Sequence, residues 1–305
     1  MHFWKRKNQI SPSIEGGSLK GWFLAIRPNT LFASISPVII GGAMAYKDHL
    51  FHLPSFLLAL FGALFIQIGT NLSNDYYDFF HGIDSEKRLG PVRVTQKGII
   101  KPESVKRGFL LSFFLAALAG IYLLIRGGLP ILIIGIISII LGILYTAGPF
   151  PISYYGIAEP FVIIFFGPIA VAGTYYVQAL SIKKEVIIAG FAPGFISNAI
   201  LTVNNLRDIN TDKESGKKSL VVRFGKRFGR MEYVFSLFMA FVIPFFLLSK
   251  THFYHLLSCL SFVFIIPYLK IIWQDPNPIY NKLLKKTSSF LFIYSLLFSA
   301  GWIFS

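Results

Sequence analysis

Long apolar runs alternate with short polar segments along almost the whole chain. Most runs are close to the length of about 20 residues that a helix needs to cross the hydrocarbon core of a bilayer. A Gly-Gly pair followed by Pro130 is a turn signal that divides the longest run into two helices. The pattern therefore predicts an all-α, polytopic membrane protein. We expect about nine transmembrane helices, over residues 22–46, 54–76, 107–126, 129–148, 156–180, 185–206, 232–249, 252–273 and 287–304.

The composition supports the membrane class. Hydrophobic residues make up 54% of the 305 residues and charged residues only 14%, whereas a soluble domain carries about 25% charged residues. This excludes an ordinary soluble enzyme, a disordered chain and a secreted disulfide scaffold, and the single Cys259 cannot form an internal disulfide. We expect one membrane-embedded domain over residues 1–305. Its polar N-terminal segment, residues 1–20, lacks the apolar core of a signal peptide.

The basic residues are distributed unevenly between the two sides of the predicted bundle. The formal net charge is +15, and 24 of the 29 Lys and Arg residues fall in the N-terminal segment and the loops on its side. The positive-inside rule then predicts a cytoplasmic (inner) membrane protein with a cytoplasmic N-terminus and an external C-terminus. Because this rule and anionic lipid explain the basic loops, we expect no nucleic-acid partner. No obligatory protein partner is evident.

Six of the 14 acidic residues form two clusters, over residues 71–84 and 204–214, each at the end of a predicted helix. Asn74 and Asp78 are four residues apart, and Asn204 and Asp208 repeat this spacing 130 positions later. Residues four apart lie on one face of a helix. Since an even number of membrane crossings separates the two helices, both clusters fall on the same side. We therefore expect two acidic faces to meet across one cytoplasmic opening.

The chemistry of these clusters points to a metal-bound diphosphate. Like charges gathered on one face repel, and carboxylate and amide oxygens are hard ligands that suit Mg²⁺. Basic residues follow each cluster, and Lys and Arg are suited to phosphate groups. We predict Mg²⁺ as the cofactor, with ligands drawn from Asn74, Asp78, Asp84, Asn204, Asp208 and Asp212.

The paired motifs resemble those of the UbiA superfamily of intramembrane prenyltransferases, which carry two Asp-rich motifs after helices 2 and 6 of a nine-helix fold. Residues 71–98 and 204–217 are similar to the 1,4-dihydroxy-2-naphthoate branch, and so are Arg27-Pro28 and residues 145–159. The 4-hydroxybenzoate branch spaces the acids of its first motif four apart, whereas Asp84 follows Asp78 by six.

The resemblance implies Mg²⁺-dependent transfer of a polyprenyl group from a polyprenyl diphosphate to 1,4-dihydroxy-2-naphthoate within the lipid bilayer. Loss of CO₂ would give demethylmenaquinone. It implies catalytic roles for Asp78, Asp84, Asp208 and Asp212. It implies substrate binding by Asn74, Arg88, Arg93, Lys97, Asn204, Asn205, Arg207, Lys217 and Tyr145.

Two other functions stay open at this point. The first is prenyl transfer to another aromatic acceptor such as 4-hydroxybenzoate. The second is an ion-coupled transporter, because intramembrane acids often mark ion pathways. The position of the acids at helix ends, rather than near the midplane, favours the enzyme.

Several further residues have two interpretations. Glu159 precedes Pro160 near a helix start, so it either complements the helix dipole or lines the aromatic pocket. Tyr145, Tyr154 and Tyr155 are either interfacial anchors or substrate contacts. His81, between Asp78 and Asp84, is either an inert loop residue or a proton acceptor.

Overall fold

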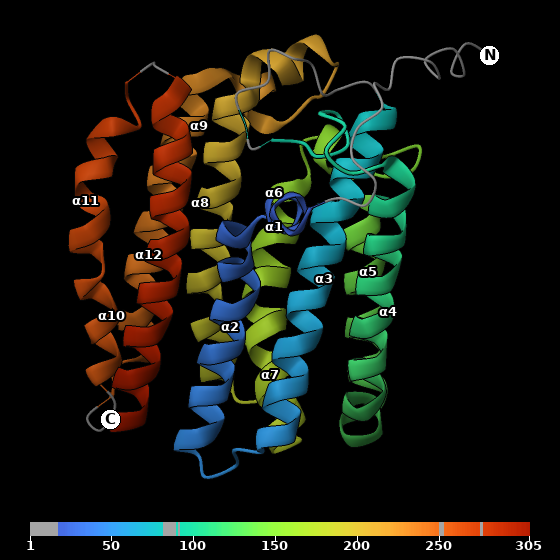
Figure 1. The fold of residues 1–305 in the computed structure, drawn as a ribbon. Coiled ribbons are helices and arrows are strands. Elements are labelled where there is room, and N and C mark those ends of the chain that lie inside the picture. Colours follow the sequence, from blue (N-terminus) through green and yellow to red (C-terminus); the bar gives the residue numbers. More distant parts are fainter. Residues whose placement is uncertain (1–17, 82–89, 91, 250–252, 275–276) are drawn as a thin grey trace.

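The computed structural model describes residues 18–81, 90, 92–249, 253–274 and 277–305. Within these residues, every regular element is a helix, which confirms the all-α prediction. Figure 1 shows the longer helices side by side, with their ends at two opposite faces of a bundle. Helices α3 (Leu53–Phe80) and α8 (Lys184–Glu214) end at the same face of the bundle. We call this face the motif end, since both predicted acidic clusters belong to it.

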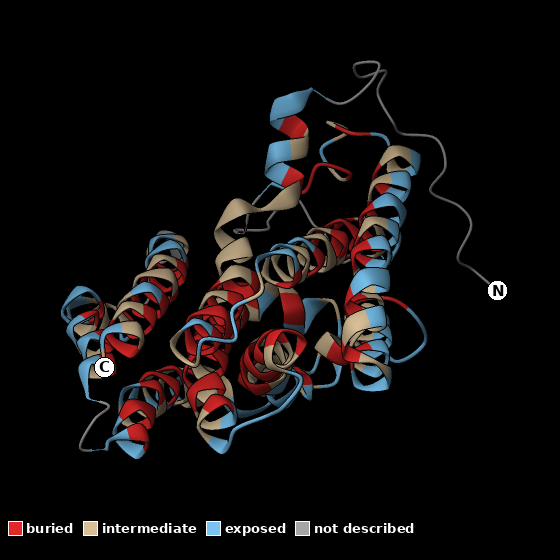
Figure 2. Ribbon diagram, turned by 90° about the horizontal axis from the view of Figure 1, so that it is seen from below, coloured by how far each residue is buried: buried red, intermediate tan, exposed pale blue. Residues whose placement is uncertain are grey.

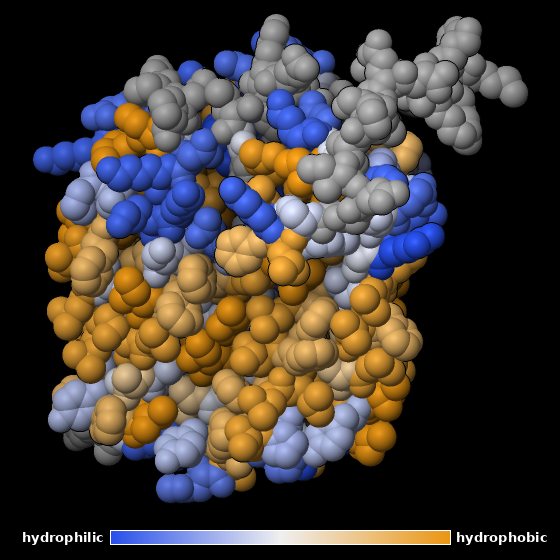
Figure 3. Space-filling model, viewed as in Figure 1, coloured by the Kyte–Doolittle hydropathy of each residue, from blue (hydrophilic) through white to orange (hydrophobic). Residues whose placement is uncertain are grey.

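The face of the bundle seen in Figure 3 carries an apolar band between two more polar ends. Eight helical stretches are long and apolar enough to cross a membrane, and a shorter apolar helix, α5 (Leu129–Leu144), accompanies them. These nine segments of the described chain fall on the nine predicted ranges, so about nine helices is confirmed. The chain is a multi-pass membrane protein. The eight stretches are Pro28–Lys47, Leu53–Phe80, Pro102–Gly127, Ala158–Ala179, Lys184–Glu214, Leu220–Leu247, Tyr254–Ile271 and Ile279–Phe304.

The first predicted helix is divided in two. A short helix α1 (Leu19–Ile26) ends at Arg27, whose φ of 55° lies in the left-handed region, and α2 (Pro28–Lys47) begins directly after it. Pro28 suits a first helical position because it has no N–H group to satisfy. The single helix expected over residues 22–46 is therefore wrong at its start. The Asn71 amide donates hydrogen bonds to the Ile26 carbonyl and the Thr30 hydroxyl, both at 2.8 Å.

Three helices form one side of the bundle. Helix α3 (Leu53–Phe80) packs along α4 (Pro102–Gly127), and α5 packs against both. Gly128, with φ of 68°, makes the turn between α4 and α5, so the predicted turn is confirmed. Figure 2 shows that the buried residues of the helices face the interior of the bundle.

The predicted helix over residues 156–180 is bent. It consists of α6 (Ala158–Ile164), the π-helical turn η2 (Phe165–Ile169) and α7 (Ala170–Ala179), with non-helical angles at Gly167 before Pro168. Helix α8 crosses this turn in backbone contact. A Cβ placed on Gly190 would lie 2.6 Å from the Cα of Pro168, and one on Gly167 would lie 2.7 Å from the Gly190 carbonyl oxygen. Only glycine permits so close a crossing.

Helix α8 (Lys184–Glu214) is central and mostly buried, and α9 (Leu220–Val242) packs along it before the short η3 (Ile243–Leu247). Both helices extend well beyond the predicted spans, so the loop expected over residues 207–230 is largely helical. Segments too polar for the bilayer can still be helical where one face is packed, as the buried Asp212, Val221 and Gly229 show. Gly225, with φ of 84°, bends the start of α9.

The C-terminal part of the chain completes the bundle. It contains η4 (Tyr254–Leu256), α10 (Leu257–Leu260), α11 (Phe262–Ile271) and α12 (Asn277–Phe304). Helix α12 packs against α2 and α8 and contributes Leu291, Tyr294 and Phe298 to the largest buried cluster.

Candidate active site

The first motif occupies the last two turns of α3. Asn74, Asp75 and Asp78 are all buried there. Arg93, from the segment between α3 and α4, forms an ion pair with Asp78, and both side chains are almost inaccessible. The Thr146 hydroxyl, just after α5, donates a hydrogen bond to the Asn74 side-chain oxygen. The two predicted ligands of α3 therefore face the same interior space as Arg93.

Asp75 holds the segment that carries Arg93. Its two carboxylate oxygens accept hydrogen bonds from the backbone N–H groups of Val94, at 3.1 Å, and Thr95, at 3.0 Å. This double contact fixes the chain beside the end of α3 and so places the Arg93 guanidinium next to Asp78. Sequence reasoning placed Asp75 in the cluster without giving it a role, although a buried acid inside the motif was the available signal.

The second motif is organised by Arg207 on α8. Its Nε and Nη2 atoms donate to the two oxygens of Asp208 at 2.8 and 2.6 Å, and Nη2 also donates to the Asn204 side-chain oxygen at 2.6 Å. A further bond of 3.3 Å from Nη1 reaches Asn281 on α12. One turn later, Asp212 forms an ion pair with Lys217 at 3.4 Å.

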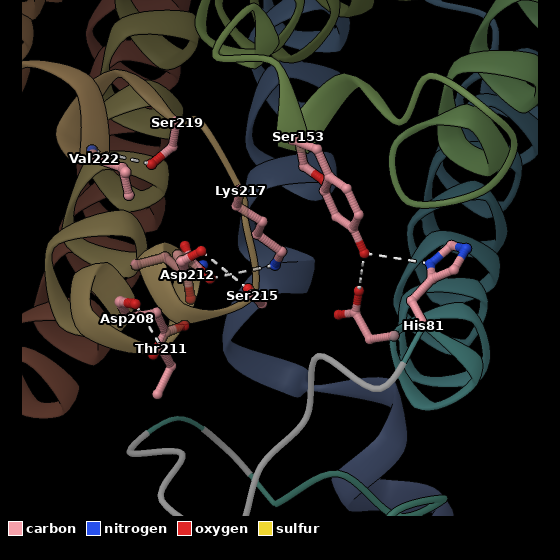
Figure 4. A network of polar contacts seen from close by, with 12 residues as sticks. His81, Ser153, Asp208, Thr211, Asp212, Ser215, Lys217, Ser219 and Val222 are labelled. Carbon is pink, nitrogen blue, oxygen red and sulfur yellow. Dashed lines mark hydrogen bonds and ion pairs between the residues drawn. The ribbon is translucent and has the colours of Figure 1, made fainter. Parts of the chain in front are cut away.

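Tyr154 and Lys217 join the two motifs. The Tyr154 hydroxyl, in the 3-10 turn η1 (Ile152–Tyr154), donates to Asp78 at 3.1 Å, and the Lys217 ammonium lies 5.1 Å from the centroid of the same ring. In Figure 4, Lys217 points toward Asp212 from the loop after α8, and His81 lies on the opposite side of the gap. Asp78, Tyr154, Lys217 and Asp212 thus form one connected row from α3 to α8.

The loops that carry this row are tied together. The Lys218 backbone N–H donates to the Tyr154 carbonyl at 2.7 Å, and the Arg223 guanidinium donates to the Lys218 and Tyr155 carbonyls at 2.9 and 2.7 Å. Gly156 packs so closely here that a Cβ would lie 2.6 Å from the Lys218 carbonyl oxygen. Sequence reasoning missed Arg223, since nothing in the sequence pairs it with a loop 68 residues away.

A cavity of about 310 Å³ opens beside these loops. The Nδ1 atom of His81 lies 3.4 Å from the Tyr154 hydroxyl. The cavity therefore adjoins the first motif on one side and the loop after α8 on the other. It is lined by His81, Gly148, Pro149, Pro151, Tyr154, Tyr155, Gly216 and Lys218.

The remaining predicted site residues do not all lie at the connected row. Asp84 and Arg88 lie outside the described residues. Lys97 is exposed, and no side-chain partner for it exists in the described part of the chain. The Asn205 amide donates to the Glu159 carboxylate at 3.5 Å.

Tyr145 follows α5 and packs among Ile152, Ala158 and Leu201. These contacts place Tyr145 beside Ala158, the neighbour of Glu159 in the sequence.

The charges of the site are balanced by the protein itself. Asp78, Asp208 and Asp212 form ion pairs with Arg93, Arg207 and Lys217, so the repulsion expected between the clustered acids is offset without a bound cation. Within the described ranges, no three His, Cys, Asp or Glu side chains form a ready-made metal cage. Mg²⁺ typically takes one or two carboxylates and completes its shell with phosphate oxygens and water. The hard oxygen donors present therefore fit a Mg²⁺ ion shared with a diphosphate.

Comparison with known proteins agrees with this geometry. Residues 34–300 match the model of the UbiA prenyltransferase family. The chain is 33% identical over 291 residues to 1,4-dihydroxy-2-naphthoate octaprenyltransferase from Escherichia coli (strain K12), covering 92% of this chain and 94% of that protein. It is 39% identical over 234 residues to the protein of the same name from Mycobacterium tuberculosis (strain ATCC 25618 / H37Rv), covering 77% and 80%.

The fold is also shared with a solved structure. A UbiA homolog from Archaeoglobus fulgidus bound to GPP and Mg²⁺ superposes with a TM-score of 0.63 at 15% identity, covering 92% of this chain and 99% of that chain.

Proposed function

The chain belongs to the UbiA prenyltransferase family, and we propose that it transfers a polyprenyl group from a polyprenyl diphosphate to 1,4-dihydroxy-2-naphthoate. Diphosphate and CO₂ leave, and the product is demethylmenaquinol, the hydroquinone form of demethylmenaquinone. Relatives that match most of the chain carry the name of this activity. Family membership favours the enzyme over the ion-coupled transporter that the sequence left open.

The geometry of the site supports the proposal independently of the names of the relatives. The connected row from Asp78 through Tyr154 and Lys217 to Asp212 brings acids and bases from distant parts of the chain to one end of a membrane bundle. A polyprenyl diphosphate needs such an end, with cations for its headgroup and an apolar interior for its tail. Arg93, Arg207 and Lys217 would contact the diphosphate, with Arg88 and Lys97 as further predicted contacts.

Mg²⁺ is part of the proposal. Asn74, Asp78, Asn204, Asp208 and Asp212 supply the oxygen donors, and Asp84 is predicted to join them. When bound, Mg²⁺ would neutralise part of the diphosphate charge and so make diphosphate a better leaving group.

Basic side chains of the protein stabilise the negative charge that develops on the diphosphate during the reaction. Breaking the allylic C–O bond leaves its electron pair on the diphosphate. Guanidinium and ammonium groups stabilise this charge most when it is fully developed, which lowers the barrier rather than merely tightening binding. The electron-rich ring of the acceptor then bonds to the allylic carbon. The apolar wall formed by Ile152, Val162 and Leu201 keeps water away from that carbon.

We also propose that the motif end faces the cytoplasm from the inner membrane, with residues 1–20 on that side and residues 1–305 forming one membrane-embedded domain. The excess of basic residues supports this orientation. At the opposite end of the bundle, basic side chains form hydrogen bonds and ion pairs within the protein. Arg126 donates to the Val177 and Gln178 carbonyls, and Lys183 pairs with Asp48 at 2.7 Å.

An acceptor panel tests the proposed function. Purified protein in detergent is incubated with Mg²⁺, labelled polyprenyl diphosphate, and either 1,4-dihydroxy-2-naphthoate or 4-hydroxybenzoate. We expect transfer to the naphthoate, with release of label from a carboxyl-labelled acceptor as CO₂. Preferential transfer to 4-hydroxybenzoate would overturn the choice of acceptor, and transfer to neither would overturn the activity.

A further inference from the structure

A stripe of polar side chains continues from the second motif into the apolar band. Asn198 and Asn205 lie on the same face of α8 as Asp212, since their spacings approach whole helical turns. At 1.5 Å per residue, Asn205 and Asn198 lie about 10 and 21 Å from Asp212 along the helix. Polar groups at such depth are costly and usually functional. The diphosphate chemistry described above uses none of the side chains at the deep end of this stripe.

Two glutamates from neighbouring helices meet this stripe. The Asn198 amide donates to Glu232 on α9 at 3.2 Å and to Ser236 at 3.1 Å. Nearer the motif end, Asn205 donates to Glu159 on α6. Helices α6 and α9, which carry the two glutamates, both pack against α8. We call Glu159, Asn198 and Glu232 the deep polar cluster.

The deep polar cluster has an excess of hydrogen-bond acceptors. Glu159 is 5% exposed and Asn198 is 3% exposed. One carboxylate oxygen of each glutamate and the amide oxygen of Asn198 are buried, and none of the three has a hydrogen-bond donor among the described residues. Among the described residues, no Arg or Lys forms an ion pair with Glu159 or Glu232. Buried acceptors without donors are unfavourable, so a ligand that brings donors would be stabilised here.

The chemistry of the substrates decides which ligand fits. A diphosphate is anionic and offers acceptors, so two carboxylates repel it, and a prenyl chain has no polar hydrogen. A dihydroxynaphthoate carries two hydroxyl donors on an apolar ring. Ala158, Val162 and Leu201 pack with Tyr145 to form an apolar wall directly beside Glu159. This wall and the free acceptors together suit a hydroxylated aromatic ring.

We propose that the deep polar cluster binds the hydroxyl edge of the aromatic acceptor, an inference that rests on the proposed function. Electrostatics then sets the orientation of the ring. The acceptor carboxylate is repelled by Glu159 and Glu232 and attracted to the cations of the motif end. The 4-hydroxyl group, which is not adjacent to the carboxylate, therefore points toward the deep polar cluster. Binding in this orientation selects acceptors that carry a hydroxyl at that position.

The test compares Glu159→Gln and Glu232→Gln with wild type, using the full chain in detergent with Mg²⁺ and polyprenyl diphosphate. Glutamine keeps the size of the side chain but presents N–H groups where the hydroxyl needs an acceptor. We expect KM for 1,4-dihydroxy-2-naphthoate to rise about 10- to 100-fold, the range for a hydrogen bond to a charged group. KM for the diphosphate should stay within about 2-fold, because the variants leave the motif residues intact.

The analogue 1-hydroxy-2-naphthoate, which lacks the 4-hydroxyl, makes the test specific. Its inhibition constant should be nearly the same for wild type and both variants. Glu185→Gln, in the first turn of α8 at the opposite end, is the matched control and should change neither constant. Thermal unfolding with and without polyprenyl diphosphate verifies that each variant is folded and still binds the donor.

The outcomes separate this inference from the function on which it rests. Unchanged KM in both variants, or equal losses for the dihydroxy acceptor and the analogue, would overturn the deep polar cluster as the hydroxyl site. A wild-type protein that transfers prenyl groups to no naphthoate would overturn the proposed function, and this inference with it.

Discussion

Tyr154 donates a hydrogen bond to Asp78 across the gap between the loop after α5 and the end of α3, with 3.1 Å between the oxygens. Through the same ring, Lys217 and Asp212 are linked to the first motif. One phenol therefore sets the position of an acid from each of two motifs that are far apart in the sequence. This relationship gives the first prediction.

Replacing Tyr154 by Phe removes the hydrogen bond but keeps the ring under Lys217. We expect kcat/KM to fall about 10-fold, the effect of losing a hydrogen bond to a charged group. Tyr154→Leu, which also removes the ring, should lose more, because Lys217 then lacks its aromatic support. Steady-state prenyl transfer in detergent measures both variants. Wild-type rates in Tyr154→Leu would show that the row does not serve catalysis.

The paired acids give the second prediction. Asp78→Asn and Asp208→Asn keep size and one oxygen but remove a charge, so we expect kcat to fall by about 10²–10³, as for other catalytic electrostatic contacts. Each change leaves a buried arginine without its partner, Arg93 or Arg207, so rates must be normalised to folded protein.

Glu214, the exposed last residue of α8, is the matched control for these acids and should tolerate Gln. Near-normal turnover in both motif variants would show that these acids have no catalytic role and only lie at helix ends.

Asp75 gives a prediction about positioning. Asp75→Ala removes both acceptors for the Val94 and Thr95 N–H groups. We expect a loss of about 1–3 kcal/mol for each buried group left unsatisfied and a rise in KM for the diphosphate as Arg93 loses its place. Limited trypsin digestion should cut faster after the exposed Lys97. Unchanged digestion together with an unchanged KM would contradict this role.

Metal removal gives the fourth prediction. Since the donor set fits Mg²⁺ shared with a diphosphate, EDTA should abolish transfer, and Mg²⁺ or Mn²⁺ should restore it. The assay is prenyl transfer after gel filtration in metal-free buffer. Full turnover in that buffer would refute metal dependence.

Orientation gives the fifth prediction. In a Cys259→Ala background, single cysteines at the exposed positions 97 and 218 should react only with reagents applied from the cytoplasmic side. A cysteine at Lys184, at the opposite end, should react only from outside. The reverse labelling pattern would overturn the proposed orientation.

The sequence predicted the helices better than it predicted their interruptions. Apolar runs locate the spans because length and hydropathy alone decide which segments can cross the bilayer. The break at Arg27 and the π-helical turn at Gly167 depend on contacts from other helices. At the first break, the Asn71 amide donates a hydrogen bond to the Ile26 carbonyl, and at the second, α8 packs directly against the turn. The charges at the adjoining ends of α8 and α9 predict a loop, but these ends are helical because one face of each is packed.

In the site, too, the features that follow from helix geometry were predictable, and the contacts that depend on tertiary packing were not. Spacing and side of the membrane indicated that the two motifs belong together, since both follow from helix geometry. The protein counterions could not be assigned in the same way. Arg207 pairs with its own neighbour in sequence, but Arg93 reaches Asp78 only because Asp75 anchors its segment. Tyr154 and Asn198 acquire their partners through loops and helix packing that no periodicity encodes.

The glycine crossing between η2 and α8 acts as a spacer for the binding site. Glu159 and Asn205 lie on the two helical segments whose separation is fixed where Gly167 meets Gly190 and Gly194, and their contact is already at 3.5 Å. A single added methyl group at the crossing would push these segments apart and lengthen the contact between Glu159 and Asn205. Glycines that are themselves remote from the two motifs therefore set the spacing of two side chains at the proposed acceptor site.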